Sequence, residues 1–277
     1  MIISRLYGGL GNQLYQYAIA RKLSIDANKK LLINKSLFSN GNYIHNYELD
    51  KFKITYDGYY DFNWLEKLKL KLVKIGLINF PNVLDEETYN IKINSFKEKY
   101  YLDDYWQDEK YFKQIKNILS DELMPKRISK NSKILVHKIQ NTNSVCMHIR
   151  RGDYLKLENL DSLGVCSTNY YFNSVDLMIE KLDKPNFFVF SDDIEWCKNN
   201  IRINGNSYFI PNSFSNIDSF YLMRHCKHYI ISNSTFSWWP AWLSNFESKI
   251  VIAPKIWWKS NPHNSPVLNN WIKINNE

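Results

Sequence analysis

The sequence IISRLYGGLGNQLYQYAIARKLSIDANKKLLIN, residues 2–34, carries the signals of a strand, a turn, a helix and a second strand in succession. IISRLY has the apolar character of a buried strand, and GGLGN is typical of a tight glycine turn. QLYQYAIARKLSIDAN is expected to be a helix that ends near Asn28, before a strand at KLLIN. This opening predicts a β-α-β unit, from which parallel α/β sheets are built.

Similar units recur in the second half of the chain. SVCMHI, residues 144–149, is strand-like and runs into RRGDY; FFVF, residues 187–190, leads to SDD and a helix at IEWCKNN; HYII leads to SNST and FSWWPAWL. Strands that alternate with helices in two separated sets predict an α/β protein of two halves, each with a parallel sheet. We place the boundary near Asn131, which gives domains of residues 1–131 and 132–277.

The composition indicates a folded protein with an anionic partner. The formal charge is +8, with 44% hydrophobic and 23% charged residues, which suits nucleic acid, an acidic membrane or a phosphorylated small molecule. Lys residues are scattered without a compact basic block, so nucleic acid is the least favoured partner. Aromatic residues make up 16% of the chain, enough for sugar stacking as well as core packing.

No feature of the sequence indicates secretion or a membrane span. The N-terminus lacks a basic stretch followed by an apolar run, which predicts a cytoplasmic protein. The four cysteines form no CxxC pair, so we expect reduced thiols. The uncharged window at residues 228–246 is interrupted by Ser, Asn and Pro.

Residues 65–80, LEKLKLKLVKIGLINF, mix Leu and Lys too evenly for a clean period, and we assign them to a helix. Their basic and apolar character fits either a membrane-docking surface or a solvated helix face.

Arg150, Arg151 and Gly152 at a strand end form the first candidate anion site. An Arg fork matches phosphate oxygens, and glycine lets a ligand approach the backbone. If Asp153 pairs with one guanidinium, the other is held ready to bind. Taken alone, the segment fits an Arg-Asp surface ion pair equally well.

SNST is the second candidate anion site, because it offers hydroxyls and amides where a helix begins. Its alternative role is plain N-capping. Trp238, Trp239 and Trp242 in the following helix are expected in the core. Since RRGD, SDD and SNST all follow strands, they are predicted to line one cleft at the carboxyl ends of a sheet, and two anion sites there imply a diphosphate.

GGLGNQ resembles the dinucleotide fingerprint but has Leu14 in place of the third glycine, which disfavours a nicotinamide or flavin cofactor. The turn still presents the amides of Leu10, Gly11 and Asn12 to a sugar or phosphate, or it is purely structural.

The sequence has no Asp-x-Asp triplet, a common pattern for binding a cation. Asp192 and Asp193 are adjacent instead, and one of them is expected to cap the next helix. Without a metal, Arg side chains and helix-end amides must meet the charge of a departing diphosphate.

Taken together, the segments of this chain closely resemble the family 11 glycosyltransferases, the bacterial α-1,2-fucosyltransferases. The segments are GGLGNQLYQYA, DYWQDEKYF (residues 104–112), HIRRGDY, FFVFSDD, SNSTFSWWPAWL and IVIAPKIWW. The resemblance spans most of the chain except about residues 43–99. Pro240 and the pair Asp103 and Asp104 depart from the family pattern, and the latter puts the acceptor in doubt.

The resemblance implies a GT-B architecture, in which two Rossmann-like halves with parallel sheets face each other across a cleft. It also implies GDP-β-L-fucose as donor, inversion at the fucose carbon, and no required metal or other cofactor. The N-terminal half would be the acceptor side and the C-terminal half would bind GDP-fucose. The acceptor would be the 2-hydroxyl of a terminal galactoside, in O-antigen or another surface polysaccharide, and a lipid-linked acceptor would hold the enzyme peripherally at the inner membrane face.

The resemblance also assigns residue roles. Arg150 would hold the β-phosphate, and His148 and Asp218 are candidates for guanine contacts. The further candidates for the donor site are Asn233, Ser234, Thr235, Ser237, Gly9, Gly11, Asn12 and Gln13.

For catalysis, Arg150 and Arg151 are expected to stabilise charge, and Asp153 or Glu158 is the candidate base; Asp153 has the alternative role of orienting Arg151. The alternatives for function are a GDP-sugar transferase of different linkage or acceptor, a carbohydrate-binding protein without catalysis, and a basic RNA-binding protein.

Overall fold

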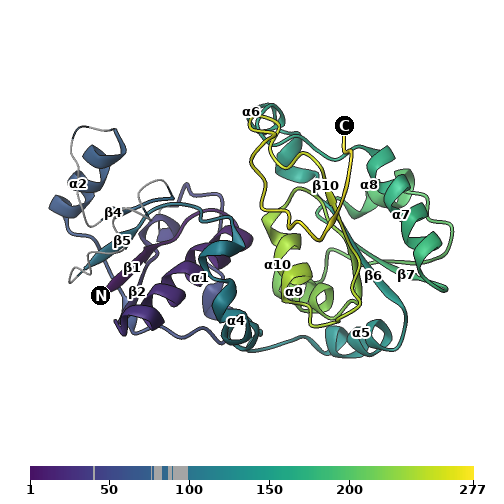
Figure 1. The fold of residues 1–277 in the computed structure, drawn as a ribbon, viewed down its shortest axis with the longest axis horizontal. Coiled ribbons are helices and arrows are strands. Elements are labelled where there is room, and N and C mark those ends of the chain that lie inside the picture. Colours follow the sequence, from purple (N-terminus) through teal and green to yellow (C-terminus); the bar gives the residue numbers. More distant parts are fainter. Residues whose placement is uncertain (40, 76, 78–82, 87–88, 90–98) are drawn as a thin grey trace. The chain divides into compact units, whose positions relative to one another are not determined.

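The computed structural model describes residues 1–39, 41–75, 77, 83–86, 89 and 99–277. The chain divides into two compact units, Met1–Met124 and Pro125–Glu277. Each unit is built around one sheet whose strands all run parallel (Figure 1). The two predicted α/β halves are therefore confirmed.

The division between the units lies before the predicted boundary at Asn131. Asn131 falls inside helix α5 (Lys130–Gln140), which is capped by Ser129. The backbone amide of Ser129 and the hydroxyl of Ser132 both donate to Asp218, at 2.9 and 2.8 Å. These bonds join α5 to helix α9 (Asn216–Arg224), so the whole of α5 belongs to the second unit.

Unit 1 opens with the predicted β-α-β segment. Its strand order is β3-β2-β1-β5-β4. Its helices and strands are β1 (Ile2–Arg5), α1 (Leu10–Ala27), β2 (Leu31–Asn34), β3 (Gly58–Tyr59), α2 (Trp64–Lys74), β4 (Val83–Leu84), β5 (Tyr100–Leu102) and α4 (Lys116–Glu122). Short 3-10 turns lie at η1 (Ser36–Ser39), η2 (Leu49–Lys51), η3 (Glu109–Tyr111) and η4 (Lys113–Ile115).

Helix α1 covers one face of the unit 1 sheet, and the hydroxyl of Ser4 donates to the carbonyl of Gln16 across that contact at 3.0 Å. The helix ends as predicted, since Asn28 takes the left-handed conformation that closes it. It starts earlier than predicted, at Leu10, because the second glycine of the turn, Gly9, is already its N-cap. GGLGN is thus half turn and half helix.

Helix α2 covers the opposite face, where Leu70 and Val73 pack with Ile3, Phe62 and Tyr101. It begins one residue before the predicted helix, since Asn63 and Glu66 form a reciprocal capping box. The helix ends at Lys74. The rest of the prediction falls on residues 75–80, of which 76 and 78–80 lie outside the described residues.

Unit 2 has the strand order β11-β10-β9-β6-β7-β8. After α5 follow β6 (Ser144–Ile149), η5 (Gly152–Leu155), α6 (Leu157–Leu160), α7 (Thr168–Lys181), β7 (Asn186–Ser191), α8 (Ile194–Asn200), β8 (Asn206–Phe209), α9, β9 (His228–Ile230), α10 (Thr235–Leu243), β10 (Val251–Pro254) and β11 (Ile272–Ile274). β6 and α8 have the bounds that the sequence predicts.

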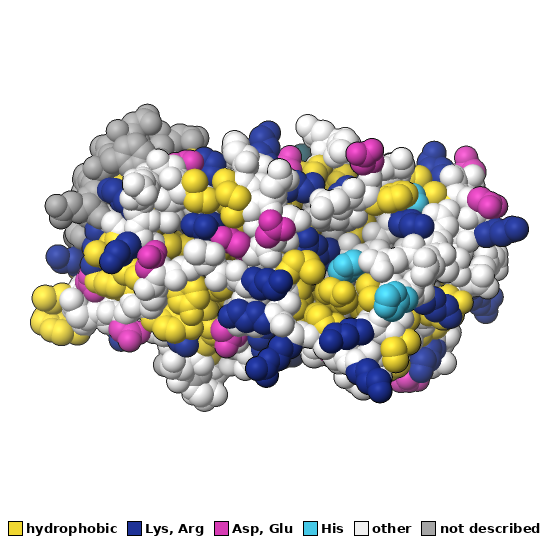
Figure 2. All heavy atoms as spheres, turned by 90° about the horizontal axis from the view of Figure 1, so that it is seen from below, with side chains coloured by type: hydrophobic (Ala, Val, Ile, Leu, Met, Phe, Trp, Pro, Cys, Tyr) yellow, Lys and Arg dark blue, Asp and Glu magenta, His cyan; other side chains and the backbone are white. Residues whose placement is uncertain are grey.

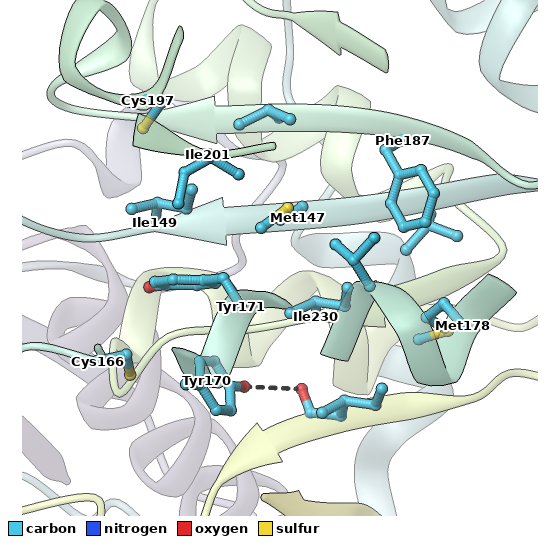
Figure 3. Close-up of a cluster of buried hydrophobic side chains, with 14 of the residues drawn as sticks. Met147, Ile149, Cys166, Tyr170, Tyr171, Met178, Phe187, Cys197, Ile201 and Ile230 are labelled. Carbon is cyan, nitrogen blue, oxygen red and sulfur yellow. Dashed lines mark hydrogen bonds between the residues drawn. The ribbon is translucent and has the colours of Figure 1, made fainter. Parts of the chain in front are cut away.

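Strand β6 is buried on both faces. One face carries Val145, Met147 and Ile149, which pack with α7 and α8 in the cluster of Figure 3. On the other face the His148 ring lies 5.7 Å from that of Phe236 in α10, which packs against α9. On α10, Trp238, Trp239 and Trp242 are all buried against one another, so their predicted place in the core is confirmed.

The four cysteines are buried free thiols, as predicted. Within the described part of the chain, no helix has both the length and the apolar character needed to cross a bilayer.

Candidate functional site

The candidate site of unit 2 lies where the direction of the sheet reverses. From β6 the chain adds β7 and β8 on one side, then returns to add β9 on the other side of β6. In open parallel sheets the loops at such a reversal diverge and leave room for a ligand. The segments that follow these strands are RRGD after β6, SDD after β7 and SNST after β9, the same three that the sequence singles out.

Arg150 is held between two carboxylates at this edge. One terminal nitrogen lies 2.6 Å from Asp153 Oδ1, and the other lies 3.2 Å from Asp192 Oδ2. The third guanidinium nitrogen, Nε, is buried and has no hydrogen-bond partner in the described residues. Because Arg is a five-donor fork, this arrangement fixes the plane of the guanidinium and leaves a donor unused.

Asp192 belongs to the SDD segment that the sequence places at this edge, but its pairing with Arg150 was not predicted. Ile149 pairs with Ser191 in the β6–β7 register, so the residues that follow each strand, Arg150 and Asp192, must lie side by side. A Cβ on Gly152 would lie 2.5 Å from Asp192 Oδ2, so the glycine is what lets this carboxylate approach. The signal was present in the sequence as two neighbouring strands, each followed by a charged residue.

Arg151 is directed elsewhere. Its guanidinium carbon lies 3.5 Å from the centre of the Trp196 ring, and its Nε lies 3.4 Å from Asp193 Oδ2. Asp193 also caps α8 through the amide of Trp196, which confirms that one of the two aspartates is a cap. The hypothesis that Asp153 orients Arg151 is wrong, since Asp153 pairs with Arg150. Arg151 itself supports the loop from the α8 side.

The N-terminus of α10 forms the other part of the edge. Ser234 is its N-cap and makes no side-chain capping bond; its carbonyl accepts from the amides of Ser237 and Trp238 at 3.1 Å each. The preceding amides of Thr235 and Phe236 are the orphan donors of the first turn, where the helix dipole favours an anion. Ser237 is buried and its hydroxyl donates back to the carbonyl of Ser234, and its contact with the donor stays a prediction.

Tyr154 connects the two parts of the site. The Arg150 guanidinium lies 5.5 Å from the centre of its ring, and its hydroxyl donates to the carbonyl of Asn233 at 3.1 Å. Burial raises the pKa of Tyr154 to about 12, so the phenol stays neutral and keeps donating. RRGDY and SNST therefore form one connected edge.

Asn233 supports this edge from beneath. Its amide nitrogen donates to the carbonyls of Leu163, Gly164 and Trp257 at 2.9, 3.2 and 3.2 Å, and the Cys166 thiol donates to its oxygen at 3.7 Å. The side chain is buried and all its polar groups are used. Asn233 thus braces three backbone segments, and its direct contact with the donor stays a prediction.

His148 is the second-to-last residue of strand β6, just before the arginines. Its Nδ1 is 2.9 Å from the Ser232 hydroxyl, and its ring centre is 5.7 Å from that of Phe236. Burial, and secondly the charge of Arg150, lowers the pKa of His148 to about 3. The ring is therefore neutral at neutral pH, with one nitrogen that accepts and one that donates.

We expect the His148 ring to stay neutral between about pH 5 and 8, where an ordinary histidine titrates. The measurement is an NMR titration of its ring signals, assigned with a His148→Gln variant. Because the unfolded ring binds a proton below about pH 6.5 and the folded ring does not, the unfolding free energy should fall as the pH drops from 6.5 toward 3. A midpoint near 6.5 in the folded protein would contradict this burial.

Asp218 is committed to the fold. Its Oδ1 accepts from Ser129 and Ser132, and its Oδ2 accepts from the Ser215 hydroxyl at 2.8 Å. Burial opposes ionisation, but the hydrogen bonds outweigh it and lower the pKa of Asp218. The carboxylate fixes the start of α9 to the start of α5, and its contact with guanine stays a prediction. Glu158, the second candidate base, is exposed on α6.

The glycine motif lies in unit 1, at the reversal between β1 and β5. Gly8 has a φ of 79°, which favours glycine, and its amide donates to the Tyr43 hydroxyl at 2.6 Å. Gly9 is half-buried and Gly11 is buried. The amide of Asn12 donates to the carbonyl of Gly9, so of the three amides expected to face a ligand this one is used internally.

Gln13 is also used internally. It is fully buried, donates to the carbonyls of Gly8 and Asn46, and accepts from the amide of Glu48 at 3.1 Å. Gln13 thus ties the glycine turn to residues 46–48, and its contact with the donor stays a prediction.

The DYWQ segment meets the glycine turn. Gln107 donates to Asn12 Oδ1 at 2.9 Å, and the Tyr7 and Tyr105 rings meet edge to face at 4.9 Å. Asp103, one of the residues that depart from the family pattern, is buried and forms a two-oxygen bond with Arg5. The edge of unit 1 is therefore rich in aromatic side chains, and Asp103 there is paired with Arg5.

Comparison with known proteins places this geometry in a family. Residues 81–275 match the profile of glycosyl transferase family 11. An α-1,2-colitosyltransferase of Escherichia coli is 36% identical over 99% of both chains. The O-antigen biosynthesis glycosyltransferase WbnK of the same species is 30% identical over 98% of this chain and 99% of its own length.

Among solved structures, NodZ α-1,6-fucosyltransferase co-crystallized with GDP aligns with a TM-score of 0.51 at 14% identity, over 86% of this chain and 90% of that one. At this identity the likeness concerns the fold, and the two-unit GT-B type of architecture is confirmed. The family profile and the relatives that match end to end show that this protein belongs to glycosyl transferase family 11.

Proposed function

We propose that this glycosyltransferase moves L-fucose from GDP-β-L-fucose to the 2-hydroxyl of a terminal galactoside, with inversion and without a metal. The observation that carries the proposal is Arg150, oriented by Asp153 and Asp192 and linked through Tyr154 to the α10 N-terminus. A fixed cation and a helix dipole at one edge suit a diphosphate leaving group.

In the proposed reaction the acceptor oxygen attacks the fucose anomeric carbon from the face opposite the nucleotide. The bond from that carbon to the β-phosphate oxygen breaks and GDP leaves with the electron pair. The acceptor hydroxyl passes its proton to a carboxylate base, for which Asp153 and Glu158 are the candidates. Negative charge on the departing oxygen grows in the transition state, where Arg150 and the Thr235 and Phe236 amides stabilise it more than in the ground state.

The acceptor is proposed to bind unit 1. Tyr105 is exposed and supported by Tyr7, and Tyr43 and His45 flank the glycine turn. Aromatic rings stack on the apolar face of a galactose ring. The relative named for O-antigen biosynthesis supports a surface glycan as the acceptor, and if that glycan is lipid-linked the enzyme works at the inner membrane face.

A second donor is favoured by one observation, the full-length relative named as an α-1,2-colitosyltransferase. Colitose is L-fucose without its 3-hydroxyl, so both donors would present the same diphosphate to Arg150. The two proposals share the 1,2 linkage and differ only in how the sugar is recognised.

The test is an assay of the purified protein with GDP-fucose, GDP-colitose and a panel of galactosides, followed by linkage analysis of the product. We expect fucose on the 2-hydroxyl, and the same rate within about twofold after EDTA, because Arg and helix amides replace the cation. Transfer from GDP-colitose alone would overturn the donor, another linkage would overturn the acceptor position, and loss of activity in EDTA restored by a divalent ion would overturn the metal-free mechanism.

Asp153→Asn separates a positioning role from a base. Since Asp153 lies 2.6 Å from Arg150, we expect it to position that guanidinium. The variant should then raise KM for GDP-fucose and lower kcat/KM by about tenfold, with the pH dependence of kcat unchanged. A loss of kcat of about a thousandfold, together with loss of the acidic limb of the pH profile, would show that Asp153 is the base.

A further inference from the structure

The outer face of α2 is apolar and exposed. Trp64 is 71% exposed and Ile75, at the end of the helix, is 58% exposed. Leu65 and Leu68 are each 47% exposed, and Leu72 is half-buried. At about 100° per residue these side chains fall within roughly one 100° arc of the helix. Soluble surfaces carry single exposed apolar residues, but a continuous stripe marks an interaction surface.

The opposite face of α2 is anchored to the sheet, so the helix cannot turn its apolar stripe inward. Glu66 Oε1 accepts from Lys99 at 2.7 Å, from Tyr101 at 2.5 Å and from Tyr60 at 2.6 Å. These bonds outweigh burial and lower the pKa of Glu66 to about 2. Leu70 and Val73 pack beside this cluster on the sheet. The hydrogen-bonded cluster around Glu66 thus faces the protein, and the apolar stripe faces solvent.

Lysines border the stripe. Lys67 and Lys71 lie on one side of it and Lys69 on the other, and all three are exposed. The face of the molecule drawn in Figure 2 also carries exposed apolar side chains with Lys and Arg beside them. A stripe with Trp at one end and ammonium groups along both borders matches a bilayer surface. There the apolar residues contact acyl chains and the lysines pair with anionic headgroups.

We propose that α2 lies in the surface of an anionic phospholipid bilayer through Trp64, Leu65, Leu68, Leu72 and Ile75, with Lys67, Lys69 and Lys71 at the headgroups. This goes beyond the proposed transfer reaction, because bilayer binding requires neither donor nor acceptor. The charge of the lysines favours a bilayer over a protein as the partner of this stripe. A protein surface would have to pair the lysines with its own carboxylates, whereas anionic headgroups supply negative charge on every side.

The test is co-sedimentation of the whole protein with vesicles of phosphatidylcholine, with or without about 30% phosphatidylglycerol. We expect binding to the anionic vesicles, little to the neutral ones, and release in about 0.5 M NaCl, which screens the lysines. Trp64→Gln with Leu68→Gln should weaken binding by about tenfold or more. Lys67→Gln with Lys71→Gln should weaken it and remove the preference for anionic lipid.

The matched control is Ile134→Gln with Leu157→Gln, two apolar residues of unit 2 that are also exposed, 64% and 87%. This variant should bind vesicles like the wild type, and the thermal transitions of all variants should coincide. Equal binding by the α2 apolar variant and the wild type would overturn the proposal. So would a wild-type dimer, seen by light scattering, that the α2 variant makes monomeric, since a second copy would then be the occupant. Fucosyl transfer by an α2 variant to a soluble acceptor is expected to be unchanged, so failure of this proposal leaves the transfer proposal standing.

Discussion

Arg150→Ala should lower kcat/KM for fucosyl transfer by about a thousandfold or more, a loss of roughly 4 kcal/mol of transition-state stabilisation. Two effects add. The cation that meets the departing diphosphate is lost, and Asp153 and Asp192, at 2.6 and 3.2 Å from the guanidinium, are left facing the phosphate site without their counter-ion. Their repulsion should also raise the Kd for GDP, measured by calorimetry.

The adjacent arginine provides the matched control. Arg151 carries the same charge one residue on, but stacks on Trp196 and pairs with Asp193. Arg151→Ala should therefore cost about tenfold or less in kcat/KM, mainly through stability. Arg150→Lys keeps the charge but not the planar fork, and should recover only part of the loss. If Arg150→Ala kept the wild-type kcat, or if the two alanine variants behaved alike, the assignment of the phosphate to Arg150 would be wrong.

The strand ends could be predicted because their signals are local. SVCMHI has no Asp, Glu, Lys or Arg on either face, as suits a central parallel strand, and it forms β6 over the predicted residues, buried throughout. The aspartate before IEWCKNN caps α8, and the tryptophans of α10 are in the core. From these strands the rule that ligands bind at carboxyl ends was enough to bring RRGD, SDD and SNST to one edge.

The partners within the site could not be predicted, because they depend on register. Nothing in RRGD says that Asp153 turns back to Arg150 rather than Arg151, and the second carboxylate comes from the neighbouring strand. Asp218 and Gln13 have the residue types of ligand contacts, yet their polar atoms are used by Ser129, Ser132 and Ser215 and by the backbone near Gly8. Only the packed structure shows which polar groups are already used.

The irregular apolar pattern of residues 65–80 has a different cause. A soluble helix shows one apolar face, but α2 has two, since Leu70 and Val73 face the sheet while Leu65 and Leu68 face solvent. Because the two apolar stripes lie on one helix, the sequence does not show the helical spacing of apolar residues that a single stripe would give. The irregular pattern is what a helix between a protein and a bilayer should show.

Asn233→Ala should unfold unit 2 at a temperature roughly 10 °C lower than the wild type, with a loss of about 3 kcal/mol in the free energy of unfolding. The amide donates to three backbone carbonyls, the buried one of Trp257 and the partly buried ones of Leu163 and Gly164, and its removal leaves each without this donor. Through these bonds Asn233 holds the segments of Leu163, Gly164 and Trp257 to the start of α10. GDP binding should therefore also weaken, even at temperatures well below the unfolding transition. Calorimetry gives both quantities.

The role of Asn233 is decided by comparing the loss of stability with the loss of GDP affinity in the Asn233→Ala variant. A brace must lower stability in the absence of any ligand, whereas a residue that only contacts the donor would weaken GDP binding and leave the unfolding temperature unchanged. Asn200→Ala is the control, since Asn200 also donates to a carbonyl, that of Trp196 at 2.8 Å, but from an exposed position where water replaces the bond. Its transition should stay within about 2 °C of the wild type. A stable Asn233→Ala protein that failed to bind GDP would place Asn233 in the set of direct donor contacts.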